Sequence, residues 1–281
     1  MSLIDGILNL AGLLLWLNWL SPRLQTRTRA ATVSLAGTLS RVESVPPSKK
    51  TSLLWLLGLI LFRGVLYFEI GPSADWTPHL QLGLIVLSFS SYSWRLMLLF
   101  SALGMLLTLV FFYLSLLLIS IANSSLPDKE PLQKLVRLHL GWVERWPLVI
   151  KWLLPPLIAG LAWFALHPLL SHFKLIPLAL NRNQIATQSL IFATSGYLGW
   201  KYLVGGILLL HMVNSYVYLG NHPFWLYLNQ TARNLLWPLR WLPLRLGRVD
   251  FTPVVAVALV FFLSDFAAPK LFEWLYSRLR L

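Results

Sequence analysis

Residues 96–122 read LMLLFSALGMLLTLVFFYLSLLLISIA, an unbroken apolar run without a charged side chain. A helix needs about 20 mostly apolar residues to cross the hydrocarbon core of a membrane, so this run predicts a transmembrane span. Five further stretches qualify or nearly qualify. We therefore predict an all-α, multi-pass transmembrane helical bundle of about six spans, at residues 3–20, 52–68, 96–122, 148–167, 197–219 and 253–266.

The composition of the whole chain agrees with this class of protein. Hydrophobic residues make up 57% of the 281 residues and charged residues only 12%, whereas about a quarter of a soluble domain is charged. The mean hydropathy is +0.67. A soluble globular enzyme is excluded on this ground. The chain contains no cysteine, which excludes c-type haem attachment and cysteine-bound iron–sulfur clusters.

The net charge of +13 comes from 23 Lys and Arg against 10 Asp and Glu. Most of these basic residues fall between the first and second, third and fourth, and fifth and sixth spans. Basic loops stay in the cytoplasm as a rule, so we expect both termini outside and a location in the plasma (bacterial cytoplasmic) membrane. The basic excess then reports topology, and binding of nucleic acid is not expected.

Two apolar runs, 80–89 and 185–193, are too short to cross a membrane. We predict two half-helices there, lying in the interface or dipping in from one side. The expected organisation is an anchor span with a basic cytoplasmic linker, a second span with the outer half-helix, a first and a second repeat unit, and an outer tail. These parts cover residues 1–51, 52–93, 94–168, 185–268 and 269–281, respectively.

The repeat rests on two cytoplasmic segments that are each bounded by proline, 131–147 and 223–238. Apolar residues recur at helical spacing along both, with polar residues on the opposite face. We predict two amphipathic helices that lie in the headgroup plane, with basic residues toward anionic lipid. Packing of the same helices on the spans as ordinary surface helices is the open alternative.

One motif surrounds the second of these segments, and its residues are Asn221, Pro223, Pro238, Pro243, Gly247, Asp250 and Pro253. Residues 197–266, which contain this motif, resemble the YggT (YlmG) family of integral membrane proteins. The resemblance implies a non-enzymatic role in organising or assembling other membrane complexes. Relatives are associated with bacterial division regions, with osmotic tolerance and potassium uptake, and in plastids with cytochrome b6 haem attachment and nucleoid distribution. The first repeat unit looks like a degenerate copy that lacks the motif.

The motif also has a reading in backbone chemistry alone. Asp250 or Thr252 can cap the sixth span, and Pro253 suits its first turn. Gly247 permits a chain reversal. The structural role of this turn is to return the chain to the membrane. The alternative role is direct contact with anionic lipid or an acidic partner through Arg233, Arg240, Arg245 and Arg248.

Ionisable residues inside spans are site candidates by default. We predict an ion-pair layer formed by Asp5, Arg63, Lys201 and Asp265, with snorkelling of each head to water as the alternative. The histidine spacing does not favour haem; His211 and Asn214 are expected to hydrogen-bond between helices. No catalytic motif, cofactor or metal site is evident.

These patterns favour a scaffold or assembly factor that binds membrane lipids, most of all anionic ones, and an unidentified membrane protein, with homo-oligomers also considered. The competing hypothesis is an ion (potassium or osmotic) transport protein or a channel accessory. Its support is the repeat, the half-helices and the Gly205-Gly206 and Pro155-Pro156 irregularities, which are common where backbone lines a path. Against it, no span carries a polar stripe long enough to line a pore, beyond Asp5, Gly6, Asn9 and Gly12 in the first span.

Overall fold

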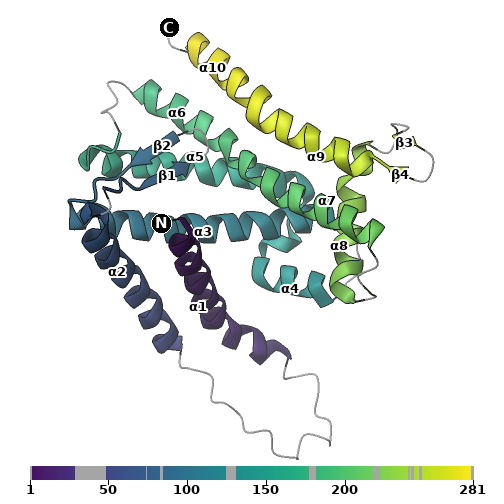
Figure 1. Cartoon of the computed structure of the whole chain (residues 1–281), viewed down its shortest axis with the longest axis horizontal. Helices are drawn as coiled ribbons and strands as arrows, with labels where there is room; N and C mark the ends of the chain where they lie inside the picture. The colour runs from purple at the N-terminus through teal and green to yellow at the C-terminus, as the bar shows by residue number, and fades with distance from the viewer. Residues whose placement is uncertain are drawn as a thin grey trace, which may run out of the picture. The chain divides into compact units, whose positions relative to one another are not determined.

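A computed structural model describes most of the chain (Figure 1). The described residues form two compact units, one built from residues up to 80 together with 88–110, the other from 81–87 together with the chain from 111 onward. Each unit is described by itself. The structure describes residues 2–28, 49–73, 75–82, 85–124, 131–176, 182–217, 220, 222–239, 241, 244–246 and 249–279.

The first unit consists of α1 (Ser2–Thr28), α2 (Lys49–Ser73) and the first part of α3 (Trp94–Ala122). Helix α1 continues through Thr28 into the predicted linker, whose remaining residues 29–48 lie outside the described part. Glycine allows the helices to approach closely. A Cβ atom on Gly12 of α1 would lie 2.6 Å from the Met105 sulfur of α3, so a side chain at this position would displace the end of Met105.

The predicted half-helix at 80–89 is wrong, because this segment forms two paired strands, β1 (His79–Leu82) and β2 (Ile85–Ser88). Its side chains alternate with a period of two. Leu87 and Phe89 are buried, whereas Val86 and Ser88 are exposed, which is the strand pattern. The Phe89 amide also donates to the Pro78 carbonyl at 2.8 Å, closing the ends of the hairpin.

The second unit holds the remaining elements. The predicted half-helix at 185–193 lies within α6, which passes through the 3₁₀ turn η4 into α7. Helix α9 likewise continues through a π-helical segment, η6, into α10, which contains most of the predicted tail (Figure 1). The elements are α4 (Pro131–Leu140), η3 (Val143–Arg145), α5 (Leu148–His172), α6 (Arg182–Ser195), η4 (Gly196–Gly199), α7 (Trp200–Tyr216), α8 (Pro223–Leu235), η5 (Trp237–Leu239), β3 (Arg245–Leu246), β4 (Val249–Asp250), α9 (Thr252–Phe262), η6 (Leu263–Ala267) and α10 (Ala268–Leu279).

Six helical stretches among the described residues are long and apolar enough to cross a membrane. The all-α prediction is thus confirmed at the level of fold class, with two small hairpins added to it. The fifth stretch is longer than predicted because α6 and α7 join. The stretches are Leu3–Leu20, Thr51–Ser73, Trp94–Ala122, Leu148–His172, Gln184–Tyr216 and Thr252–Lys270.

The two predicted amphipathic segments form α4 and α8. Helix α4 ends at Leu140, because Gly141 takes a left-handed conformation (φ +57°) that stops the helix. The predicted continuous apolar face up to Trp146 is therefore wrong beyond residue 140. Two apolar clusters hold these helices to the rest of the second unit: Val136 and Leu140 pack with the end of α3 and Trp200, and Ala232 packs with Leu208 and Ala256.

Helices α7 and α9 approach closely at Gly205, where an added Cβ atom would lie 2.9 Å from the Phe261 ring. Gly206, its neighbour, has no atom within 4 Å of the same position. We expect Gly205→Leu to lower the free energy of unfolding by about 1–3 kcal/mol through overpacking. Gly206→Leu is the matched control, and we expect it to leave the free energy of unfolding unchanged or to raise it by up to about 1 kcal/mol. Unfolding by SDS titration measures both, and equal losses in the two variants would contradict this packing.

Candidate functional site

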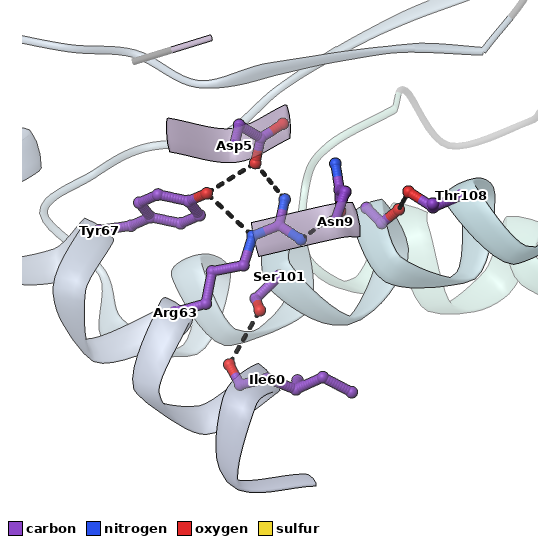
Figure 2. Close-up of polar contacts among 8 residues, drawn as sticks. Asp5, Asn9, Ile60, Arg63, Tyr67, Ser101 and Thr108 are labelled. Carbon is purple, nitrogen blue, oxygen red and sulfur yellow. Dashed lines mark hydrogen bonds and ion pairs between the residues drawn. The ribbon is translucent and has the colours of Figure 1, made fainter. Parts of the chain in front are cut away.

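A buried arginine is the centre of the polar site in the first unit. Arg63 lies on α2 within a candidate span, and only 2% of it is exposed. Tyr67 follows one helical turn later and is fully buried. Helix α1 supplies Asp5 and Asn9, also one turn apart, so both face α2. Figure 2 shows the side chains of Asp5, Asn9 and Tyr67 converging on the guanidinium group of Arg63.

Each part of the guanidinium group has its own acceptor. The Nε–H donates to the Tyr67 hydroxyl at 2.9 Å, and Nη1 donates to Asn9 Oδ1 at 2.6 Å. Nη2 forms an ion pair with Asp5 Oδ1. The Tyr67 hydroxyl donates in turn to the same Asp5 oxygen at 2.6 Å. The charge and the hydrogen bonds of the arginine are thereby matched within the protein, as a buried charge requires.

Helix α3 completes the surroundings of Arg63. A Cβ atom on Gly104 would lie 2.9 Å from Arg63 Nη2, so glycine makes room for the guanidinium group. The centre of that group lies 5.9 Å from the centroid of the Phe100 ring and 5.3 Å from that of Tyr67, within cation–π range. One turn of α3 is also tied to α2, because the Ser101 hydroxyl donates to the Ile60 carbonyl at 2.8 Å (Figure 2).

The four residues predicted as one charged layer pair two by two. Arg63 pairs with Asp5 in the first unit, and Lys201 of α7 pairs with Asp265 in the second unit. The Lys201 ammonium also lies 4.9 Å from the centroid of the neighbouring Tyr202 ring. Asp265 lies in the π-helical segment that joins α9 to α10. Each pair links two candidate spans through opposite charges.

A second polar cluster, which the sequence reading missed, joins the end of α3 to α8. Asn123 is fully buried; its amide nitrogen donates to Thr231 Oγ1 at 2.7 Å and its oxygen accepts from Asn234 at 3.0 Å. Tyr227 donates to the oxygen of fully buried Gln133 on α4 at 2.6 Å. These contacts join the two repeat units through their amphipathic helices.

A third cluster surrounds Glu144, in the turn between α4 and α5. Its carboxylate accepts hydrogen bonds from the Ser120 hydroxyl and, at 3.1 Å, from Lys151 of α5, and it lies 3.4 Å from Arg137 Nε. Lys151 is only 5% exposed, although the sequence placed it among the cytoplasmic basic residues. Helical spacing could not have indicated this pair, because Glu144 lies in η3 and Lys151 in α5, so the two residues do not share one helix. His211 pairs with Asn229 of α8 at 2.8 Å; no contact with Asn214 is involved.

The described residues of the YggT-like motif agree with the prediction made from backbone chemistry. Asp250 Oδ1 accepts from the Thr252 amide at 2.9 Å, and Pro253 stands in the first turn of α9. Strands β3 and β4 pair antiparallel, with Arg245 opposite Asp250. Pro223 is the first residue of α8. The ring of His222, the residue before it, accepts a hydrogen bond from the Phe224 amide at 3.2 Å. Pro238 lies in η5, which follows α8.

Several residues of this turn lie outside the described part of the chain: Asn221, Arg240, Pro243, Gly247 and Arg248. The backbone of Arg245 is described, but its side chain is not. Arg233 is exposed on α8. The structure therefore does not bring the four predicted contact arginines together as a described site.

The polar residues of these clusters form hydrogen bonds and ion pairs. Within the described ranges, no group of three or more His, Cys, Asp or Glu side chains is arranged to hold a metal ion. No protein-family model, curated protein or solved structure matches the chain. The resemblance to the YggT family therefore remains a prediction from the motif residues.

The Arg63 cluster is expected to respond strongly to the loss of one partner. Arg63→Met leaves Asp5 without its cation, and we expect the free energy of unfolding to fall by about 3–5 kcal/mol. The double variant Asp5→Leu/Arg63→Met removes both charges and is expected to recover a large part of this loss. SDS unfolding of the three proteins measures the difference; additive losses in the double variant would show that the pair does not stabilise the unit.

Asn123 is expected to hold α8 against α3. Asn123→Ala leaves the Asn234 amide and Thr231 hydroxyl without their buried partner, and we expect a loss of about 1–3 kcal/mol in the free energy of unfolding. Ser124→Ala changes the exposed next residue and is the control. Amide hydrogen exchange along α8 reports the same effect locally, with faster exchange in the Asn123 variant alone. Unchanged exchange there would contradict the role of the cluster.

Proposed function

We propose that this chain is a non-enzymatic integral membrane scaffold that organises or assembles other membrane protein complexes. In this proposal the helices of Figure 1 that are long and apolar enough cross the plasma membrane, with both termini outside. The basic turns face the cytoplasm and contact anionic lipid or an acidic region of a partner.

The main support for this proposal is what the polar residues of α1 contact in the structure. Asp5 and Asn9 are the side chains that a conduit along the first span would need, and both bind Arg63. Gly12 packs against Met105. The polar residues of α1 therefore hold helices together, which supports a scaffold over a transport path.

Further features of the fold weaken the transport hypothesis. Of the two half-helices on which it depended, the one predicted at 80–89 is a β-hairpin, and the one predicted at 185–193 belongs to a helix that continues into α7. Gly205, whose irregularity suggested backbone lining a path, packs against Phe261. Broken helices and small residues are common where backbone lines a transport path, and here Gly205 is accounted for by its packing against Phe261.

Exposed indoles support contact of the turns with the membrane interface. Trp142 follows α4 and is 75% exposed; Trp237 and Trp241 follow α8 and are 70% and 79% exposed. Tryptophan is enriched where membrane meets water, because its ring is apolar and its N–H is polar. The two turns carry these side chains at corresponding places of the repeat, beside basic residues. The resemblance to the YggT family adds the expectation of an organising role.

The lipid contact can be tested by replacing Arg233, Arg240, Arg245 and Arg248 together with Gln. Each basic residue near an anionic surface contributes about 1 kcal/mol of attraction, so the preference for phosphatidylglycerol over phosphatidylcholine should fall at least roughly tenfold. Energy transfer from the tryptophans to fluorescent phosphatidylglycerol, in vesicles of mixed composition, measures this preference.

The matched control replaces the same four residues with Lys, which keeps the charge. We expect the Lys variant to retain the preference and the helical content of both variants to match the parent chain. Equal phosphatidylglycerol enrichment in the parent chain and the Gln variant would overturn the lipid contact. Loss in both variants would mean that guanidinium geometry, rather than charge, provides the recognition.

A further inference from the structure

The two intramembrane ion pairs differ in how completely they are enclosed. Arg63 and Asp5 have side chains that are 2% and 27% exposed, and Asp5 Oδ1 also accepts from Tyr67. Lys201 is 16% exposed, but Asp265 is 46% exposed. The Oδ1 atom of Asp265 accepts a hydrogen bond from the Lys201 ammonium group. The second carboxylate oxygen of Asp265 has no hydrogen-bond donor among the described residues. The second pair is open on one side.

The depth of Asp265 makes this exposure costly. The candidate span runs from Thr252 to Lys270, and at about 1.5 Å per residue Asp265 lies roughly 20 Å from its start. A hydrocarbon core of about 30 Å places the carboxylate well inside the far boundary. Lysine and arginine reach water with long side chains, but aspartate has only one methylene group. An acceptor at this position therefore needs a donor from another molecule.

The helix around Asp265 is also irregular. Leu263–Ala267 form a π-helical turn, a feature that is frequent at functional sites. Ser264 is buried and its hydroxyl has no partner among the described residues. Elsewhere in the chain Ser115 and Ser189 donate to the carbonyl four residues earlier, at 2.7 and 2.8 Å. The π-turn thus interrupts the internal bonding of the helix at the place where the carboxylate faces outward.

We propose that the face of α9 around Asp265 binds a transmembrane helix of a partner protein, which donates a hydrogen bond from an uncharged Asn or Gln amide to the open Asp265 oxygen. Lys201 already neutralises the carboxylate, so an uncharged donor completes the site without adding net charge to the membrane. The surrounding face is apolar, as helix packing in a membrane requires. The exposed residues of this face include Leu259, Phe262, Leu263 and Phe266. The rings of Phe262 and Phe266 stack with their centroids 5.8 Å apart.

This inference rests on the proposed function, since it names how a scaffold in the membrane holds its partner. Its test uses a defined probe, a single-span polyleucine peptide with one Asn at the depth of Asp265. The full chain has no cysteine, so a donor dye can be attached to one introduced at the exposed Ser277 of α10. Energy transfer to acceptor-labelled peptide in phosphatidylcholine vesicles then measures association.

We expect the Asn peptide to bind the parent chain about threefold to thirtyfold more tightly than an all-leucine peptide, the range found for single interhelical hydrogen bonds. The variant Lys201→Met/Asp265→Leu removes both charges at once and is expected to abolish this difference. Lys270→Met removes a charge from the same helical stretch but leaves the ion pair in place, and it is the matched control, expected to retain the preference. Tryptophan fluorescence and SDS unfolding confirm that each variant is folded.

Three results would overturn the inference: equal binding of the Asn and all-leucine peptides, an unchanged preference in the double variant, or tighter binding of a Lys-bearing peptide. A fourth result would also overturn it: energy transfer between donor-labelled and acceptor-labelled full chains that is lost in the Lys201→Met/Asp265→Leu variant would assign the face to a second copy. The vesicles contain no anionic lipid, so failure here is distinguishable from failure of the lipid contact in the four-arginine variant.

Discussion

The first unit depends on the need to enclose the positive charge of Arg63 within apolar helices. A guanidinium group has five N–H donors and a charge that is never lost, so burial is tolerated only where acceptors and an anion surround it. Asp5, Asn9 and Tyr67 meet this need. Two of them come from α1, most of whose residues are at least partly exposed. Attachment of α1 to α2 thus depends on polar contacts more than on buried apolar area.

The second unit follows the same rule with uncharged groups. Asn123 and Gln133 are fully buried, and each connects one repeat unit to α8 of the other. In hydrocarbon, apolar side chains gain little by leaving lipid, so helix association depends on packing and on hydrogen bonds between helices. The polar side chains of this chain therefore act as the specific contacts that determine which helices meet. The open oxygen of Asp265 is the same kind of contact with one partner still to be supplied.

The sequence predicted the long helices because span length and hydropathy are properties of contiguous residues. The prediction was wrong at 80–89, because a short apolar run fits either a half-helix or a strand. The two are distinguished by burial, which alternates between buried Leu87 and Phe89 and exposed Val86 and Ser88. It ended α4 too late, since the left-handed Gly141 interrupts an otherwise helical pattern. Gln133 belongs to the polar face predicted for residues 131–147, but it is buried and accepts from Tyr227, a residue distant in sequence. Charged residues could be singled out as candidates, whereas their pairing required the fold.

The central claim is that the polar side chains of α1 are bound to Arg63 and do not line a water path. The absence of cysteine makes a single introduced thiol unambiguous. We would measure the reaction of Asn9→Cys with a charged maleimide in reconstituted vesicles, with Ser124→Cys as the exposed reference. The account predicts that the thiol at position 9 reacts only after unfolding in SDS. Labelling of the folded protein at the rate of the reference would contradict it and would favour a conduit along the first span.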